Sequence, residues 1–152
     1  MKKKNKGFTM VELLAVITIM GILTALAVPA VTKYIAKGRN QSYETMFKST
    51  YEAAENYMMD EAGLISVGAT KTIPIADLVN QQYLEPLIDP GSKNNASCAE
   101  DSDDTEEDPD DAESKVVVKR LANSDGGIPN YQYTVYIKCP SFSEVKSETF
   151  PK

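Results

Sequence analysis

Few side chains in this sequence could carry out catalysis. It contains no histidine, which is the usual general base near neutral pH and the commonest metal ligand. This absence excludes Ser-His-Asp and Cys-His catalysis, and two cysteines alone cannot complete a cysteine-rich zinc site. We therefore expect neither an enzyme nor a cofactor. Cys98 and Cys139 instead predict one disulfide in an exported domain, with two free thiols as the alternative.

Carboxylates are concentrated in one run. Residues 100–113 hold ten of them and no base, with no apolar residue larger than alanine, so we expect a solvated loop. Clustered carboxylates also offer the hard oxygen ligands that Ca²⁺ prefers, and calcium binding is the alternative interpretation. The spacing does not match an EF-hand loop, which argues for weak affinity at most. The candidate ligands are Asp101, Asp103, Asp104, Glu106 and Asp108.

The remaining charge is balanced once the first seven residues are set aside. The chain has 16 bases and 22 acids, and its formal net charge is −6. Without the four lysines of residues 1–7 and the ten acids of residues 100–113, twelve bases and twelve acids remain. A nucleic-acid-binding surface needs an exposed basic patch, so the acidic run disfavours direct nucleic-acid binding.

An apolar run follows the N-terminal lysines. Residues 13–31 carry no formal charge and, as a helix, would span roughly 28 Å, close to the thickness of a bilayer's hydrocarbon core. The preceding lysines predict that residues 1–6 stay in the cytoplasm while the C-terminal bulk lies outside. A cleaved signal peptide and an uncleaved signal anchor are the two general interpretations.

Glu12 fits neither interpretation well. A carboxylate within the membrane costs on the order of 2–3 kcal/mol or more, and an ordinary leader has no use for one. Ala25 and Ala27 form only a weak signal-peptidase site, since the apolar stretch continues beyond them.

The residues around Glu12 resemble a known processing site. The string Lys6-Gly7-Phe8-Thr9-Met10-Val11-Glu12-Leu13-Leu14 is similar to the prepilin peptidase site of type IV pilins and of the pseudopilins of type II secretion and competence systems. The resemblance implies cleavage after Gly7 and N-methylation of the new terminus at Phe8. It also implies that Glu12 pairs with the Phe8 amine of a neighbouring subunit, and that Pro29 matches a helix-kinking proline of the family.

The same resemblance implies partners and location. The precursor would lie in the inner (cytoplasmic) membrane and the processed subunit in an extracellular surface filament. Its partners would be other pilin subunits, major and minor, a prepilin peptidase/methylase, and an assembly ATPase acting through a membrane platform protein. The filament would serve surface motility, adhesion, DNA uptake or secretion. The alternative function is a single-pass membrane-anchored surface binding module, in which calcium binds the acidic loop.

Helical periodicity continues beyond the apolar run. An apolar stripe through residues 43–58 predicts that the helix runs from about Thr9 to about Glu61, with a soft spot near Pro29 and Gly38. Helix termination at Pro29 is the alternative. Gly63 is a natural C-cap. We expect the stripe to be core, packed against a small sheet.

The C-terminal part predicts strands and turns. Residues 115–121 and 130–139 read as strands, and we expect 116–121 and 131–138 to form an antiparallel hairpin. A third strand is expected near Ile73 or Phe150, and one or two helical turns over residues 76–84, followed by a proline-bounded turn at 85–91.

Together these features predict an α+β, pilin-like fold in which a long N-terminal helix packs on a small antiparallel sheet. The expected divisions are a leader (residues 1–7), a membrane or filament-core helix (8–31), its amphipathic continuation (32–62) and a globular head (63–152) that contains the acidic loop 100–113.

Overall fold

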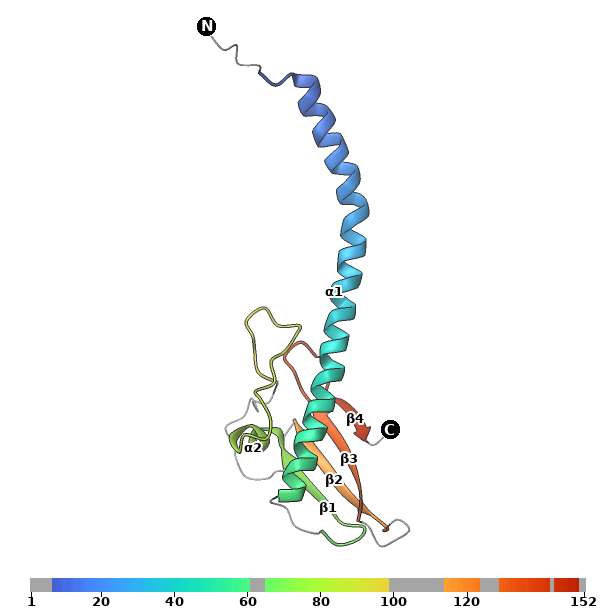
Figure 1. Ribbon diagram of the computed structural model, residues 1–152, viewed down its shortest axis with the longest axis vertical. Helices are drawn as coiled ribbons and strands as arrows, with labels where there is room; N and C mark the ends of the chain where they lie inside the picture. The colour runs from blue at the N-terminus through green and yellow to red at the C-terminus, as the bar shows by residue number, and fades with distance from the viewer. Residues whose placement is uncertain (1–6, 61–64, 99–113, 124–128, 143, 151–152) are drawn as a thin grey trace. The chain divides into compact units, whose positions relative to one another are not determined.

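The computed structural model describes residues 7–60, 65–98, 114–123, 129–142 and 144–150. Its elements in chain order (Figure 1) are α1 (Met10–Asp60), β1 (Thr70–Pro74), α2 (Ile75–Asn80), β2 (Lys115–Leu121), β3 (Asn130–Ile137) and β4 (Lys146–Phe150). The chain divides into two compact units, Met1–Asn40 and Gln41–Lys152. The predicted α+β class is confirmed.

Helix α1 is continuous over 51 residues and includes Pro29. The alternative in which the helix ends at Pro29 is therefore wrong, and α1 also continues through Gly38 and Asn40. By length and composition alone, this helix could cross a membrane. The predicted cap at Gly63 lies outside the described residues.

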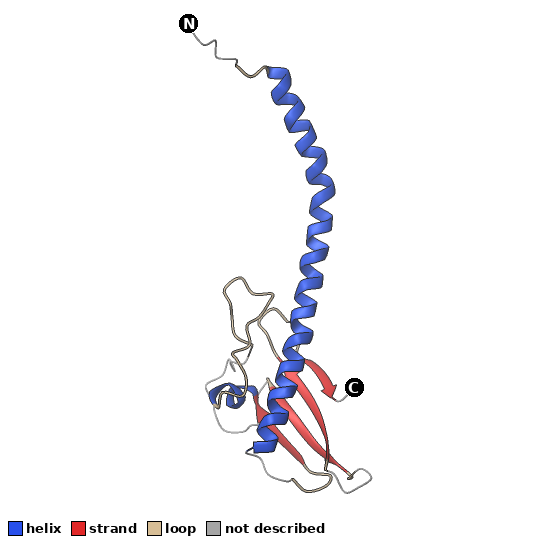
Figure 2. Cartoon of the chain, in the orientation of Figure 1, coloured by secondary structure: helices blue, strands red, loops and turns tan. Residues whose placement is uncertain are grey.

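The sheet is antiparallel throughout, in the order β1-β2-β3-β4 (Figure 2). The predicted hairpin is confirmed: β2 pairs with β3 in a register that places Val116 opposite Val135 and Leu121 opposite Asn130. The two sites proposed for a third strand are both strands, since Ile73 lies in β1 and Phe150 in β4.

Two predicted elements are shorter than expected. α2 ends at Asn80 because Gln82 adopts a left-handed conformation (φ 65°), and the backbone N–H groups of Tyr83 and Leu84 turn back to the Leu78 carbonyl. β3 ends at Ile137 because the chain then turns at Cys139, whose carbonyl accepts the N–H of Phe142.

The core of the second unit lies between the C-terminal part of α1 and one face of the sheet. The predicted stripe is confirmed as core: Phe47, Ala54 and Met58 are buried against strand residues. Tyr51 contacts Tyr133 edge-on (centroids 5.2 Å apart) and stacks on Phe150 (4.9 Å). The alternating strand pattern thus supplies one apolar face, on which the helix packs.

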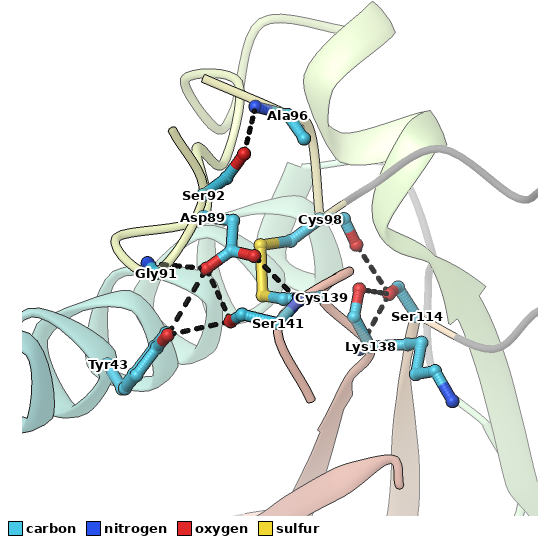
Figure 3. The surroundings of a disulfide bond; sticks show 10 residues. All are labelled: Tyr43, Asp89, Gly91, Ser92, Ala96, Cys98, Ser114, Lys138, Cys139 and Ser141. Atoms are coloured by element: carbon cyan, nitrogen blue, oxygen red, sulfur yellow. Dashed lines mark hydrogen bonds between the residues drawn. A yellow bond between two sulfur atoms is a disulfide. The ribbon is translucent and has the colours of Figure 1, made fainter. Parts of the chain in front are cut away.

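The Cys98–Cys139 disulfide is present and both cysteines are fully buried (Figure 3). It ties the segment after α2 to the end of β3. Ser114 supports it, because its hydroxyl donates to the Cys98 carbonyl (2.6 Å) and accepts the Lys138 N–H (3.0 Å). Closing a long loop restricts the unfolded chain and so stabilises the fold.

Sequence analysis missed a buried carboxylate beside this disulfide. Asp89 is only 2% exposed. Its Oδ1 accepts hydrogen bonds from the Gly91 N–H (2.7 Å), the Ser141 hydroxyl (2.7 Å) and the Tyr43 hydroxyl (3.1 Å), and its Oδ2 accepts the Ser141 N–H (2.8 Å; Figure 3). Asp89 therefore joins α1, the 85–91 turn and the β3–β4 connection.

Gly91 is required by this junction. A Cβ on Gly91 would lie 2.6 Å from the Ser141 hydroxyl oxygen and 3.0 Å from the Tyr43 hydroxyl oxygen. The side chains that bind Asp89 thus leave no room for any residue larger than glycine.

Asp89 makes stability depend on pH. Burial acts to raise the pKa of Asp89, but the hydrogen bonds from Ser141, Gly91 and Tyr43 outweigh burial and hold that pKa below its ordinary value. Since an unfolded aspartate has a pKa of about 3.9, this stabilisation is complete above that pH and is lost as the pH falls through the lower, folded pKa.

We predict that Asp89→Asn lowers the free energy of unfolding near neutral pH by about 1–3 kcal/mol. The free energy of unfolding of this variant should also decrease less steeply as the pH falls. Thermal denaturation from pH 6 to 2 checks this, with the exposed Asp77→Asn as control; equal acid slopes for Asp89→Asn and wild type would contradict it.

Thr50 marks a place where the core can be improved. This residue is fully buried on α1, and its hydroxyl has no hydrogen-bond partner among the described residues. Thr50→Val removes the hydroxyl at nearly constant volume and should raise the free energy of unfolding by about 1–2 kcal/mol. The exposed Thr45→Val is the matched control and should change stability by less than about 0.5 kcal/mol. The measurement is thermal denaturation of the chain in detergent, and a lower unfolding temperature for Thr50→Val than for wild type would refute this prediction.

Candidate functional site

The predicted processing residues lie just before α1. Gly7 is exposed, and nothing lies within 4 Å of the position that a Cβ would occupy. The Phe8 side chain is 81% exposed. Among the described residues, no side chain covers the Gly7–Phe8 bond, which leaves its backbone open to an enzyme.

Thr9 and Glu12 form a capping box at the start of α1. Glu12 Oε2 accepts hydrogen bonds from the Thr9 N–H (3.0 Å) and hydroxyl (2.9 Å), and the Thr9 hydroxyl accepts the Glu12 N–H (3.3 Å). Each side chain thus satisfies a backbone donor at the helix end. Sequence analysis missed this role of Thr9, although Thr-x-x-Glu before an apolar run is its signature.

The box places a carboxylate where the helix favours one. The unpaired N–H groups at a helix N-terminus carry partial positive charge, so Glu12 in the first turn is stabilised there. The capping residue Thr9 lies two residues after Gly7, and α1 begins at the next residue, Met10. A cut after Gly7 would therefore leave a new amine only one residue before the cap.

The N-terminal part of α1 presents apolar side chains all round. Every large apolar side chain from Phe8 to Ile35 is at least 46% exposed. The threonine hydroxyls of this segment bond to its own carbonyls: Thr18 donates to Ala15 (2.8 Å) and Thr24 to Met20 (2.7 Å). A helix with its polar groups satisfied internally suits a lipid or protein surrounding.

Pro29 lies within this apolar helix rather than at its end. It lacks an N–H, so one helical hydrogen bond is absent there. The Thr32 hydroxyl lies against the carbonyls of Val28 (3.3 Å) and Pro29 (3.0 Å) in the same turn.

The part of the chain that the structure describes contains no group of acidic or cysteine side chains that could hold a metal. The calcium candidates Asp101, Asp103, Asp104, Glu106 and Asp108 lie outside the described residues. In the described residues Glu12 contacts Thr9, while Gly7 and Phe8 are exposed just before them, and the disulfide lies in the other unit.

The N-terminal residues match a family model. Residues 2–28 match the prokaryotic N-terminal methylation motif. The chain is 34% identical over 58 residues to the type IV major pilin protein PilA of Myxococcus xanthus, covering 38% of this chain and 26% of that protein. It is 31% identical over 88 residues to the fimbrial protein EcpC of Eikenella corrodens, covering 58% and 56% of the two chains.

A third relative is the type IV major fimbrial protein FimA of Dichelobacter nodosus, 38% identical over 72 residues that cover 46% of each chain. The chain thus spans between about a quarter and just over half of the length of the curated relatives it matches. No solved structure matches it significantly. The N-terminal segment thus carries the methylation motif and is similar to type IV pilin and fimbrial proteins, as its sequence predicts.

Proposed function

We propose that this chain is a structural subunit of a type IV pilus or pilus-like filament, cut after Gly7, methylated at Phe8 and polymerised through α1. The observation that carries the proposal is an apolar helix that is exposed along its N-terminal part, begins at Met10, three residues after Gly7, and carries a carboxylate, Glu12, in its first turn. Such a helix needs lipid or other helices around it, and it provides one polar group for specificity.

Each proposed division of the chain has one task. Residues 1–7 are the leader, and residues 8–31 are the membrane helix before assembly and the filament core after it. Residues 32–62 continue the helix into the head, and residues 63–152 form the head that lies outside the core. The exposed backbone at Gly7 supports recognition by a membrane prepilin peptidase.

Cleavage would change what Glu12 binds. Before the cut, Glu12 Oε2 is engaged by Thr9. After the cut, the Phe8 amine is a full positive charge in an apolar surrounding and requires a counter-charge. We propose that Glu12 of a neighbouring subunit supplies it, because a charge that is costly to bury alone fixes the register between otherwise apolar helices.

Pro29 is proposed to assist assembly. The missing hydrogen bond lets the helix adjust locally while neighbouring helices pack against it. The family suggests further partners: minor pilins, and an assembly ATPase acting through a membrane platform protein. The precursor would lie in the cytoplasmic membrane and the filament outside the cell, where it would serve motility, adhesion, DNA uptake or secretion.

Co-expression with a prepilin peptidase tests processing. We expect a mature N-terminus at methylated Phe8, read by intact mass, and filaments visible by electron microscopy after shearing. A chain that retains Met1–Gly7 and forms no filaments would instead be a membrane-anchored surface binding module.

Variants of Glu12 separate charge pairing from capping. We predict that Glu12→Ala is still cleaved but is not incorporated into filaments. The amount of subunit recovered in sheared filaments should fall at least about tenfold, because losing about 1.4 kcal/mol per contact already reduces an equilibrium constant tenfold. Glu12→Gln keeps a capping acceptor without the charge and should fail equally. Thr9→Val removes the cap but keeps the carboxylate and should assemble. Normal filaments from Glu12→Gln would refute charge pairing.

A further inference from the structure

Two asparagines stand in the sequence pattern Asn-x-Ser/Thr, which accepts N-linked sugars when the middle residue is not proline. The two stretches are Asn40-Gln41-Ser42 and Asn95-Ala96-Ser97. In exported proteins the pattern is used in surface loops, where a transferase can reach the side-chain amide. The surroundings of each asparagine therefore decide whether it can serve as an acceptor.

Asn95 lies in a loop whose two arms are joined by backbone hydrogen bonds. The Cys98 N–H donates to the Leu87 carbonyl (2.8 Å), and the Asp89 N–H donates to the Ala96 carbonyl (2.9 Å). The disulfide and the hydrogen bonds to the Asp89 carboxylate anchor the same two arms to the rest of the head. The loop is thus held in place up to the turn that contains Asn95.

This turn leaves the Asn95 side chain in solvent. The Ser92 hydroxyl accepts the N–H groups of Asn94 (3.2 Å) and Ala96 (3.4 Å; Figure 3). Asn95 lies between them with φ 52° and is exposed, and its side-chain amide has no hydrogen-bond partner among the described residues. A transferase can therefore approach this amide without opening the loop.

Asn40 is exposed too, but its backbone is different. It lies within α1, in an uninterrupted helical segment, and not in a loop. Of the two stretches that carry the pattern, only Asn95-Ala96-Ser97 combines it with a surface turn.

We propose that Asn95 is an N-glycosylation site and that Asn40 is not. In the reaction, Asn95 Nδ2 forms a bond to the anomeric carbon of a sugar that a membrane lipid carries through a pyrophosphate. The bond between that carbon and the pyrophosphate oxygen breaks, the lipid pyrophosphate leaves, and Nδ2 gives up one proton to the transferase. The site requires the head to lie outside the cytoplasm, as in the proposed function.

The left-handed backbone is a second reason for an asparagine at this position, because asparagine tolerates positive φ better than most residues. That role needs no hydroxyl two residues later, whereas the acceptor pattern does. Variants of Ser97 therefore separate glycosylation from the backbone requirement.

Intact mass of the full chain, purified from the cells that naturally make it, tests the site. We expect a mass above that of the processed, disulfide-bonded chain by one or more sugars. Asn95→Gln and Ser97→Ala should each remove this increment, while Ser97→Thr, which keeps the pattern, should retain it. Asn94→Gln, a matched change at the exposed neighbour outside the pattern, and Asn40→Gln should leave the increment unchanged.

Two outcomes would overturn the proposal: a wild-type chain without the increment, or an increment that survives Asn95→Gln. The second would assign the sugar to a hydroxyl group or to another asparagine. Because glutamine strains a left-handed turn, Ser97→Ala supplies a second loss variant in which Asn95 stays in place, and thermal denaturation checks that both variants fold.

The same spectra also report the N-terminus. A chain cut before Phe8 that carries no sugar contradicts this inference alone, while a sugar on Asn95 of an uncut chain supports the site and contradicts the proposed function.

Discussion

The apolar surface at the start of α1 is the constraint on which the other features depend. Every large apolar side chain from Phe8 to Ile35 is at least 46% exposed, and Val16 has this lowest value. Water cannot accommodate such a surface on a separate helix, so it requires hydrocarbon or other helices. Hydroxyls such as those of Thr18 and Thr24 bond within the helix, and residues 13–31 carry no formal charge, so Glu12 is the charged side chain at the start of this stretch. This segment matches the prokaryotic N-terminal methylation motif, and the relatives that it resembles are pilin and fimbrial proteins.

The same helix has a different task in its second part. From Phe47 to Met58 its buried side chains complete the core of the head against β2 and β3. The head then holds α1 through polar contacts as well, since Tyr43 binds Asp89 and Ser141 and its ring contacts Phe142 edge-on (4.7 Å). The disulfide and Ser114 secure the neighbouring segment. A single helix therefore provides both an exposed apolar surface in its first part and core residues of the second unit in its last part.

Local patterns in the sequence were enough to predict the elements. The apolar stripe of α1 and the alternation of β2 and β3 predicted the helix, the hairpin and the core, because periodicity records which side chains face inward. The cysteine pair predicted the disulfide.

The Asp89 junction could not be predicted in this way, because its partners Tyr43 and Ser141 come from positions 46 and 52 residues away and only the fold brings them together. α2 was overestimated because a left-handed Gln82, unlike a glycine, gives no signal that a helix is ending. The Thr9 cap, by contrast, has a local signature, because Thr-x-x-Glu before an apolar run is the sequence pattern of a capping box.

The Thr9–Glu12 box has a consequence for timing. In the uncut chain Glu12 Oε2 already accepts two hydrogen bonds from Thr9, one from its backbone N–H and one from its hydroxyl. In the proposed function, cleavage would add a competitor of full charge, and a charged amine binds a carboxylate more strongly than a neutral hydroxyl and amide do in an apolar surrounding. In the proposed function, Thr9 would occupy the Glu12 carboxylate until the subunit is processed, and the order of events would follow from the relative strength of two partners for the same oxygen atom.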